Sequence, residues 1–170
     1  MAARRSRDWT LLIYKIPPQP TRLRLQIWRR LQKMGALYLQ DAACLLPALP
    51  EHTENMQYVA AAIEEMGGTC FLFSAGSILP TNPEQIEAEF RQLADGRLDE
   101  IARRLDKLSD TLDNADLPIL EQAEEDLKRE RVAYLRARKL AYCGSTREAE
   151  VDARLDRLKQ RLDDLYRSSK

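Results

Sequence analysis

The spacing of apolar residues changes once along this chain, near residue 80, and that change constrains the fold more than any other feature. Up to residue 76, short apolar runs of strand length alternate with amphipathic stretches of helix length, separated by proline or glycine. From residue 81 onward, apolar residues recur every three or four positions. We therefore expect two parts, an α+β domain over residues 8–80 and a helical region over residues 81–170.

Four short apolar runs in the first part predict strands. Residues 10–16 are almost continuously apolar and stop at two prolines, as a buried central strand does. Residues 36–40 and 43–49 are separated by Asp41-Ala42, which predicts a tight hairpin. The fourth run covers residues 69–76.

Two amphipathic stretches predict helices between these strands. Apolar side chains recur at 4-4-3 spacing in residues 22–34, and Gly35 follows as a helix end. The second helix is expected to begin at Thr53 and to end at Gly67-Gly68. The order strand, helix, strand, strand, helix, strand is the ferredoxin-like βαββαβ arrangement, an antiparallel sheet with both helices on one face.

The second part predicts an antiparallel helical hairpin or three-helix bundle with short turns. Thr81-Asn82-Pro83-Glu84 has the composition of a helix start. The apolar rhythm changes beside Gly96, which predicts a bend or a split near 95–97. A middle helix is expected over about 118–142.

The last helix should follow Gly144, because Ser145 and Glu148 have the spacing of a capping box. Its apolar residues recur at the 4-3-4-3 spacing of a coiled-coil seam. This spacing suits the core of an intramolecular bundle, and it suits a homodimer formed through the C-terminal helices equally well. The seam residues are Val151, Leu155, Leu158, Leu162 and Leu165.

Basic residues are concentrated at the front of a chain whose net charge is zero. The first forty residues carry nine basic side chains against Asp8 alone, whereas residues 81–170 carry a net charge of −3. On the helix over residues 22–34, cations project opposite the apolar stripe, as expected for contact with phosphates or another anion. A merely solvated helix face is the alternative. Trp28 is either an edge of the core or a contact residue. The candidate nucleic-acid- or anion-binding residues are Lys15, Arg22, Arg24, Arg29, Arg30 and Lys33.

No assembled catalytic, metal or cofactor site is expected. The one histidine, His52, has no second imidazole to complete a metal site or a relay, and we expect it at the surface or as a helix cap. Cys44 and Cys70 lie in apolar runs and should behave as small buried hydrophobes, whereas Cys143 should be more exposed. Their odd number and wide spacing favour neither disulfides nor zinc. No apolar run approaches a membrane span of roughly 18 residues, so a cytoplasmic protein is expected.

A distinctive set of residues lies between Trp9 and Gly68: Tyr14-Lys15, Pro17, Pro20, Arg24, Trp28-Arg29-Arg30-Leu31, Gly35-Ala36, Leu39-Gln40-Asp41 and Leu46-Pro47. Through these residues the segment resembles the N-terminal domain of the ChrB family of bacterial chromate-resistance proteins, and the resemblance continues more weakly beyond residue 80. It implies a role as a chromate-responsive transcriptional regulator. Typical members continue into a second domain, whereas this sequence stops at Lys170, so what that domain supplies, such as effector sensing, is expected to be missing or to reside in another polypeptide.

The same pattern is also similar to the middle domain of the phenylacetate repressor PaaX and, more distantly, to the ferredoxin-like nuclease of CRISPR adaptation. That nuclease carries an acidic metal ligand where this chain has Lys15, which would repel magnesium. We therefore expect a DNA-associated, non-catalytic regulatory or accessory protein. The alternatives are a protein-interaction or dimerisation module and a protein that binds an oxyanion such as chromate.

Overall fold

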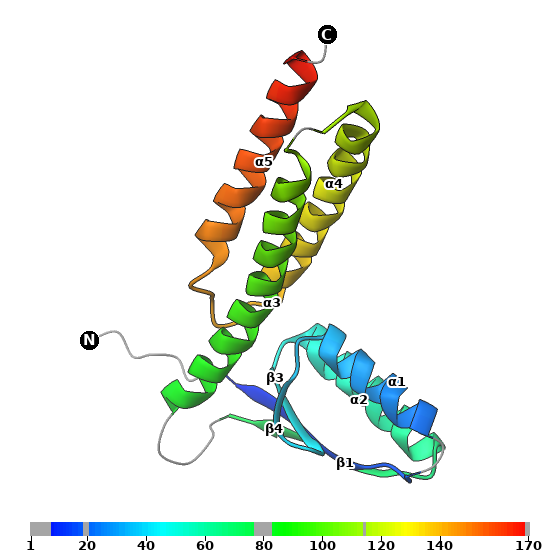
Figure 1. Cartoon of the computed structure of the whole chain (residues 1–170). Helices are drawn as coiled ribbons and strands as arrows, with labels where there is room; N and C mark the ends of the chain where they lie inside the picture. The colour runs from blue at the N-terminus through cyan, green and yellow to red at the C-terminus, as the bar shows by residue number, and fades with distance from the viewer. Residues whose placement is uncertain (1–7, 19–20, 77–82, 114, 169–170) are drawn as a thin grey trace, which may run out of the picture. The chain divides into compact units, whose positions relative to one another are not determined.

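A computed structural model of the chain describes residues 8–18, 21–76, 83–113 and 115–168 (Figure 1). The chain divides into two compact units, Met1–Glu84 and Gln85–Lys170. The proposed capping residues Thr81 and Asn82 lie outside the described residues.

The first unit is the predicted ferredoxin-like fold. Its sheet has the strand order β2-β3-β1-β4, and every neighbouring pair is antiparallel. Both helices cover one face of this sheet (Figure 1). The elements are β1 (Trp9–Lys15), α1 (Thr21–Lys33), β2 (Leu37–Gln40), β3 (Ala43–Pro47), α2 (Pro50–Glu65) and β4 (Thr69–Ala75).

The core of this unit forms where the central strand meets the apolar stripes of the helices. Leu12 of β1 is fully buried, as are Leu31 of α1 and Ile63 of α2. The chain leaves α2 through Gly67, whose φ of 76° favours glycine. A Cβ atom on the next residue, Gly68, would lie 2.6 Å from the carbonyl oxygen of Lys15, so the backbones of β1 and this turn can approach only because no side chain is present.

The start of α2 and the position of His52 were predicted wrongly. The helix begins at Pro50, because proline suits the first helical position, and Thr53 already donates its backbone N–H to Leu49. His52 consequently lies in the first turn and is only 3% exposed. Its Nδ1 lies 2.8 Å from the carbonyl oxygen of Pro47, at the end of β3.

The second unit consists of three helices, each running opposite to the one before it (Figure 1). They share one apolar core, to which all three contribute. Within the described residues, no helix combines the length and the apolar character that crossing a membrane requires. The helices are α3 (Pro83–Thr111), α4 (Leu117–Lys139) and α5 (Glu148–Ser168).

Of the bend or split predicted near 95–97, the split does not occur, because α3 is one helix across this region. Ala94, which is buried, continues the stripe between Phe90 and Leu98 at 4-4 spacing. The sequence suggested an interruption because Leu93, which is only partly buried, was assigned to the apolar stripe instead of Ala94. Gly96 is exposed and does not interrupt the helix.

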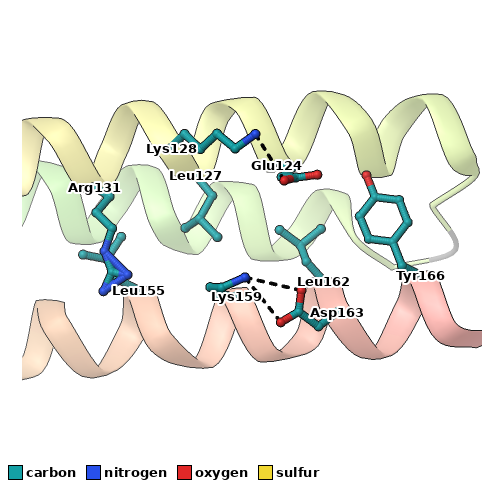
Figure 2. Close-up of a pocket in the computed structure, with 9 residues that line it drawn as sticks. All are labelled: Glu124, Leu127, Lys128, Arg131, Leu155, Lys159, Leu162, Asp163 and Tyr166. Atoms are coloured by element: carbon teal, nitrogen blue, oxygen red, sulfur yellow. Dashed lines mark hydrogen bonds and ion pairs between the residues drawn. The ribbon is translucent and has the colours of Figure 1, made fainter.

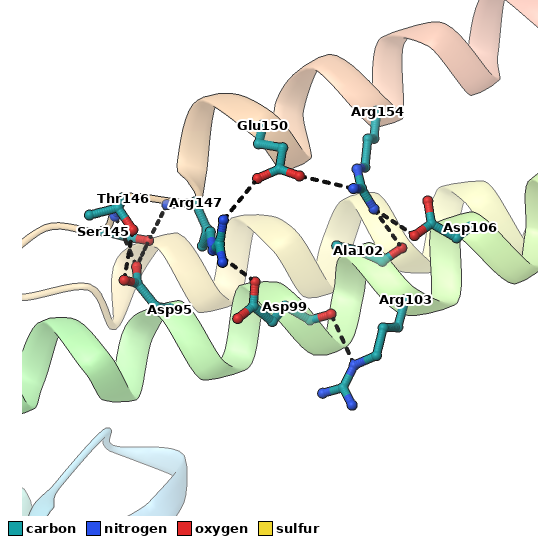
Figure 3. A network of polar contacts seen from close by, with 10 residues as sticks. All are labelled: Asp95, Asp99, Ala102, Arg103, Asp106, Ser145, Thr146, Arg147, Glu150 and Arg154. Carbon is teal, nitrogen blue, oxygen red and sulfur yellow. Dashed lines mark hydrogen bonds and ion pairs between the residues drawn. The ribbon is translucent and has the colours of Figure 1, made fainter.

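The predicted capping box is also wrong. Because α5 begins at Glu148, Ser145 lies ahead of the cap position, where its Oγ accepts the backbone N–H of Arg147 at 3.0 Å. Asp95 of α3 instead fixes the two residues Ser145 and Thr146 ahead of α5. Its carboxylate accepts hydrogen bonds from the Ser145 hydroxyl and from the backbone N–H (2.9 Å) and hydroxyl (2.8 Å) of Thr146, and we call this set of contacts the Asp95 cap (Figure 3).

The seam of α5 packs inside its own unit. Val151, Leu155, Leu158 and Leu162 are buried in the three-helix core, and Leu165 packs against that core. These side chains are therefore occupied within the bundle, which makes them unsuitable as the surface of a homodimer.

Candidate nucleic-acid interface

The outward side of α1 carries three of the predicted cations. Arg22, Arg29 and Lys33 are exposed, whereas Ile27 and Leu31 on the opposite side are buried. This separation follows from the helical period of 3.6 residues, which the sequence pattern already indicated. We call Arg22, Arg29 and Lys33 the α1 crest.

Arg30 flanks the crest on the side of α2. Its guanidinium carbon lies 4.0 Å from the centre of the Tyr58 ring, a cation–π contact between the two helices. Together with Leu25 and the crest residues, Arg30 lines a shallow depression on α1. The contact with Tyr58 holds this arginine in place without neutralising its charge.

Lys15 and Arg24 border a second depression, on the other flank of α1. Leu25 lines both depressions and so joins them into one surface. Trp28 is 47% exposed and lines this second depression, so it is a surface residue and not part of the core. Asp41, from the β2–β3 turn, places one carboxylate beside the two cations.

A pair of tyrosines supports this second depression. The hydroxyls of Tyr14 and Tyr38 lie 3.1 Å apart, in hydrogen-bonding distance. Burial raises the pKa of both phenols, although Tyr38 and Arg24 offset part of the rise at Tyr14. Both hydroxyls therefore remain protonated donors at neutral pH. Sequence reasoning missed this pair, because β1 and β2 lie on either side of β3 and only the folded sheet brings the two side chains, 24 residues apart, into contact.

The cations of this surface are not neutralised by the part of the chain that the structure describes. None of the six candidate residues forms an ion pair with a described carboxylate, whereas the cations of the helical unit are extensively paired. Arg154, for example, lies 2.7 Å from Asp106 and 2.9 Å from Glu150 (Figure 3). The charges of the second unit thus pair between and along its helices, whereas those of α1 have no carboxylate partner among the described residues.

A groove between α4 and α5 of the helical unit suits anions poorly (Figure 2). Leu127, Leu155 and Leu162 line it. Its basic residues are paired: Lys128 lies 3.2 Å from Glu124, and Lys159 lies 3.4 Å from Asp163. The groove is therefore apolar with an internally balanced charge.

Reactive side chains are scarce in the described residues. No group of three or more histidine, cysteine, aspartate or glutamate side chains there could hold a metal ion. Cys44 is buried as expected, and burial raises the pKa of its thiol to about 12. Cys70 is only partly buried, with its thiol 3.4 Å from the carbonyl oxygen of Ala60, and Cys143 is partly buried as well.

Comparison with known proteins places this chain in a family. The family model described as "Protein ChrB, N-terminal" matches residues 24–168. The chain belongs to the ChrB N-terminal family. It is thereby related to chromate-resistance proteins.

A relative from Cupriavidus metallidurans, Protein ChrB, is 32% identical over 87 residues. The matched region is 51% of this chain and 26% of that relative, so the chain spans about a quarter of the relative's length. No solved structure matches the chain.

The extent of the family match bears on both units. It runs through all five helices, so the helical unit belongs to the ChrB N-terminal region and is not an addition to it. Four of the candidate cations, Arg24, Arg29, Arg30 and Lys33, lie inside the match, whereas Lys15 and Arg22 precede it.

Proposed function

We propose that this chain is a non-catalytic regulatory or accessory protein of bacterial chromate resistance that binds DNA through the α1 crest. The observation that carries the proposal is the exposed set of cations on α1, for which no described carboxylate acts as a partner. Family membership supplies the chromate-resistance context.

The dimensions of α1 suit a phosphate backbone. From Arg22 to Lys33 the helix rises by about 16 Å, at about 1.5 Å per residue. One DNA strand presents a phosphate roughly every 3.4 Å along the axis, so this length faces about five phosphates. Arg30 on one flank, and Lys15 and Arg24 on the other, extend the surface sideways.

Replacing the α1 crest should weaken DNA binding and its dependence on salt. We expect the triple variant Arg22→Gln, Arg29→Gln, Lys33→Gln to bind promoter DNA of its own operon more weakly than the unaltered chain. The slope of log K against log salt concentration should become shallower by about 0.9 for each phosphate that the variant no longer neutralises. Fluorescence anisotropy between low and moderate salt measures both quantities.

A charge-matched control separates a local interface from general attraction. Arg129, Arg136 and Arg167 are exposed arginines of the helical unit, so replacing all three by glutamine removes the same charge. This control should retain the affinity and slope of the unaltered chain. Equal losses in both triple variants would contradict an interface on α1. If the unaltered chain does not bind DNA at low salt but binds chromate in calorimetry, the oxyanion alternative is favoured. The groups available to hold the oxyanion are then Lys15, Arg24 and the Tyr14 hydroxyl.

A further inference from the structure

The two edges of the sheet differ in how well they resist pairing with another strand. β2 forms one edge with only four residues, and its register shifts between Tyr38 and Gln40, two features that protect an edge. β4 forms the other edge with seven residues that pair with β1 continuously from Thr69 to Ala75. Its sequence, TCFLFSA, contains no charged residue and no proline. β4 therefore lacks the usual devices that prevent edge pairing.

Two aromatic side chains make this edge apolar. Phe71 and Phe73 are 63% and 48% exposed, and their ring centres lie 6.4 Å apart. Cys70 contacts Ala60 of α2 and so points toward the helices. Because side chains alternate along a strand, Phe71 and Phe73 lie on the face of the sheet that α1 and α2 do not cover.

The sequence of β4 is complementary to itself. Phe71-Leu72-Phe73 is symmetric about Leu72, and small residues lie beyond it on both sides. An antiparallel copy centred on Leu72 sets Phe71 opposite Phe73 of the second copy, and aromatic cross-strand pairs of this kind stabilise sheets. Because β4 has no charged side chain, pairing it with its own copy does not place like charges opposite one another.

We propose that β4 pairs antiparallel with β4 of a second copy of this chain, with the two-fold axis at Leu72. The interface is isologous, and it joins two four-stranded sheets into one of eight strands. The two-fold axis is perpendicular to the sheet, so α1 and α2 of both copies lie on the same side. Pairing through β4 would thereby bring two α1 crests to one side of the dimer.

The assembly state of the full chain tests this interface. We expect analytical ultracentrifugation to give a dimer for the unaltered chain and a monomer for the variant Phe71→Lys, Phe73→Lys, because the lysines oppose one another across the two-fold axis. Both side chains are exposed, so the fold should tolerate the change. The control Val132→Lys, Leu135→Lys alters two α4 side chains of similar exposure, 48% and 50%, and should remain a dimer.

A crosslink tests the register. Centring on Leu72 sets Ser74 opposite Cys70 of the second copy, with Cα atoms about 4.5–5.5 Å apart, within disulfide reach. Under mild oxidation Ser74→Cys should yield a covalent dimer, and Cys70→Ala, Ser74→Cys should not. Failure to crosslink would overturn the register.

An unaltered chain that stays monomeric, or a dimer that survives Phe71→Lys, Phe73→Lys, would overturn the interface. A monomer that binds DNA through α1 would reject this proposal and leave the proposed function intact.

Discussion

The basic side chains around α1 differ in what surrounds them, and that difference assigns them separate roles. Arg22, Arg29 and Lys33 face solvent, so they are suited to long-range attraction of a polyanion. Arg30 is fixed by the ring of Tyr58 and can present its charge at lower conformational cost. Lys15 and Arg24 share their depression with the carboxylate of Asp41. The α1 crest should consequently dominate binding to DNA.

Cys44 illustrates how burial suppresses the chemistry of a thiol. The residue is fully buried in the first unit, and burial raises its pKa from 9.0 to about 12. The thiolate, which is the nucleophile and metal ligand, is therefore almost absent at neutral pH. The interpretation of Cys44 as a small core residue is confirmed by its burial.

The raised pKa of Cys44 predicts a loss of stability at high pH. Between pH 9 and about 12 the unfolded chain loses the thiol proton while the folded chain keeps it, so the free energy of unfolding falls as pH rises. The slope for one group approaches about 1.4 kcal/mol per pH unit. Urea unfolding at several pH values should show a shallower decline for Cys44→Ala than for the unaltered chain. Identical slopes would contradict the buried-thiol argument.

Residue periodicity predicted the exposed cations but not the buried polar contacts. The side of α1 on which Arg29 lies follows from helical geometry alone. The burial of His52 does not, because it depends on where α2 begins and on the carbonyl of Pro47. The Tyr14–Tyr38 contact likewise requires the sheet to be assembled.

Asp95 connects α3 to the start of α5, and this contact explains why α5 begins where it does. Three hydrogen bonds from Ser145 and Thr146 end on its carboxylate (Figure 3). Burial by itself raises the pKa of Asp95, but these hydrogen bonds, with that of the Arg147 backbone, outweigh it and leave the pKa below its usual range. The carboxylate thus acts as a cap supplied by another helix.

Removing this cap should destabilise the helical unit. We expect Asp95→Ala to lower the free energy of unfolding by about 1–2 kcal/mol, as for the loss of a strong helix cap. Hydrogen exchange should increase in the first turn of α5. Asp106→Ala, which breaks an exposed ion pair with Arg154, is the matched control and should cost at most about 1 kcal/mol.

The same cap predicts a dependence on acid. Because the folded pKa of Asp95 is lowered, its contribution is fully present above the ordinary value of 3.8 and disappears as pH falls through the lowered value. The stability difference between the unaltered chain and Asp95→Ala should therefore shrink below pH 4. A constant difference down to low pH would contradict the role of the charged carboxylate.

Element types followed from the apolar period, whereas element ends depended on contacts. The four strands and five helices of the described residues were all anticipated, because short apolar runs differ from longer stretches in which apolar residues recur every three or four positions. The errors occurred at boundaries. The second helix was expected to begin at Thr53, although α2 already begins at Pro50. Ser145 was expected to form a capping box with Glu148, although its hydroxyl donates to Asp95, fifty residues away.

At the scale of the whole molecule, each unit has a core of its own. The sheet and two helices enclose one set of apolar side chains, and α3, α4 and α5 enclose another. The family match nevertheless runs across both. The basic surface lies entirely in the first unit, so the helical unit is not required to form it.

Separate cores and a localised basic surface lead to a prediction about fragments. Residues 83–170 should fold as a cooperative helical unit, because the fragment keeps all three helices and every side chain of their shared core. It should bind promoter DNA weakly, because residues 81–170 carry a net charge of −3, whereas residues 1–82, which carry the α1 crest, should retain salt-dependent binding. Thermal unfolding followed by circular dichroism checks the folding of each fragment, and fluorescence anisotropy on the same DNA checks its binding.

A chain truncated after Ser145 is the contrasting case. It lacks Val151, Leu155 and Leu158 of the helical core, so the remaining α3–α4 pair should lose cooperative unfolding while the first unit still binds DNA. DNA binding by residues 83–170 alone would contradict an interface on α1. It is not expected, because arginines of that unit already form ion pairs with carboxylates such as Asp106 and Glu130.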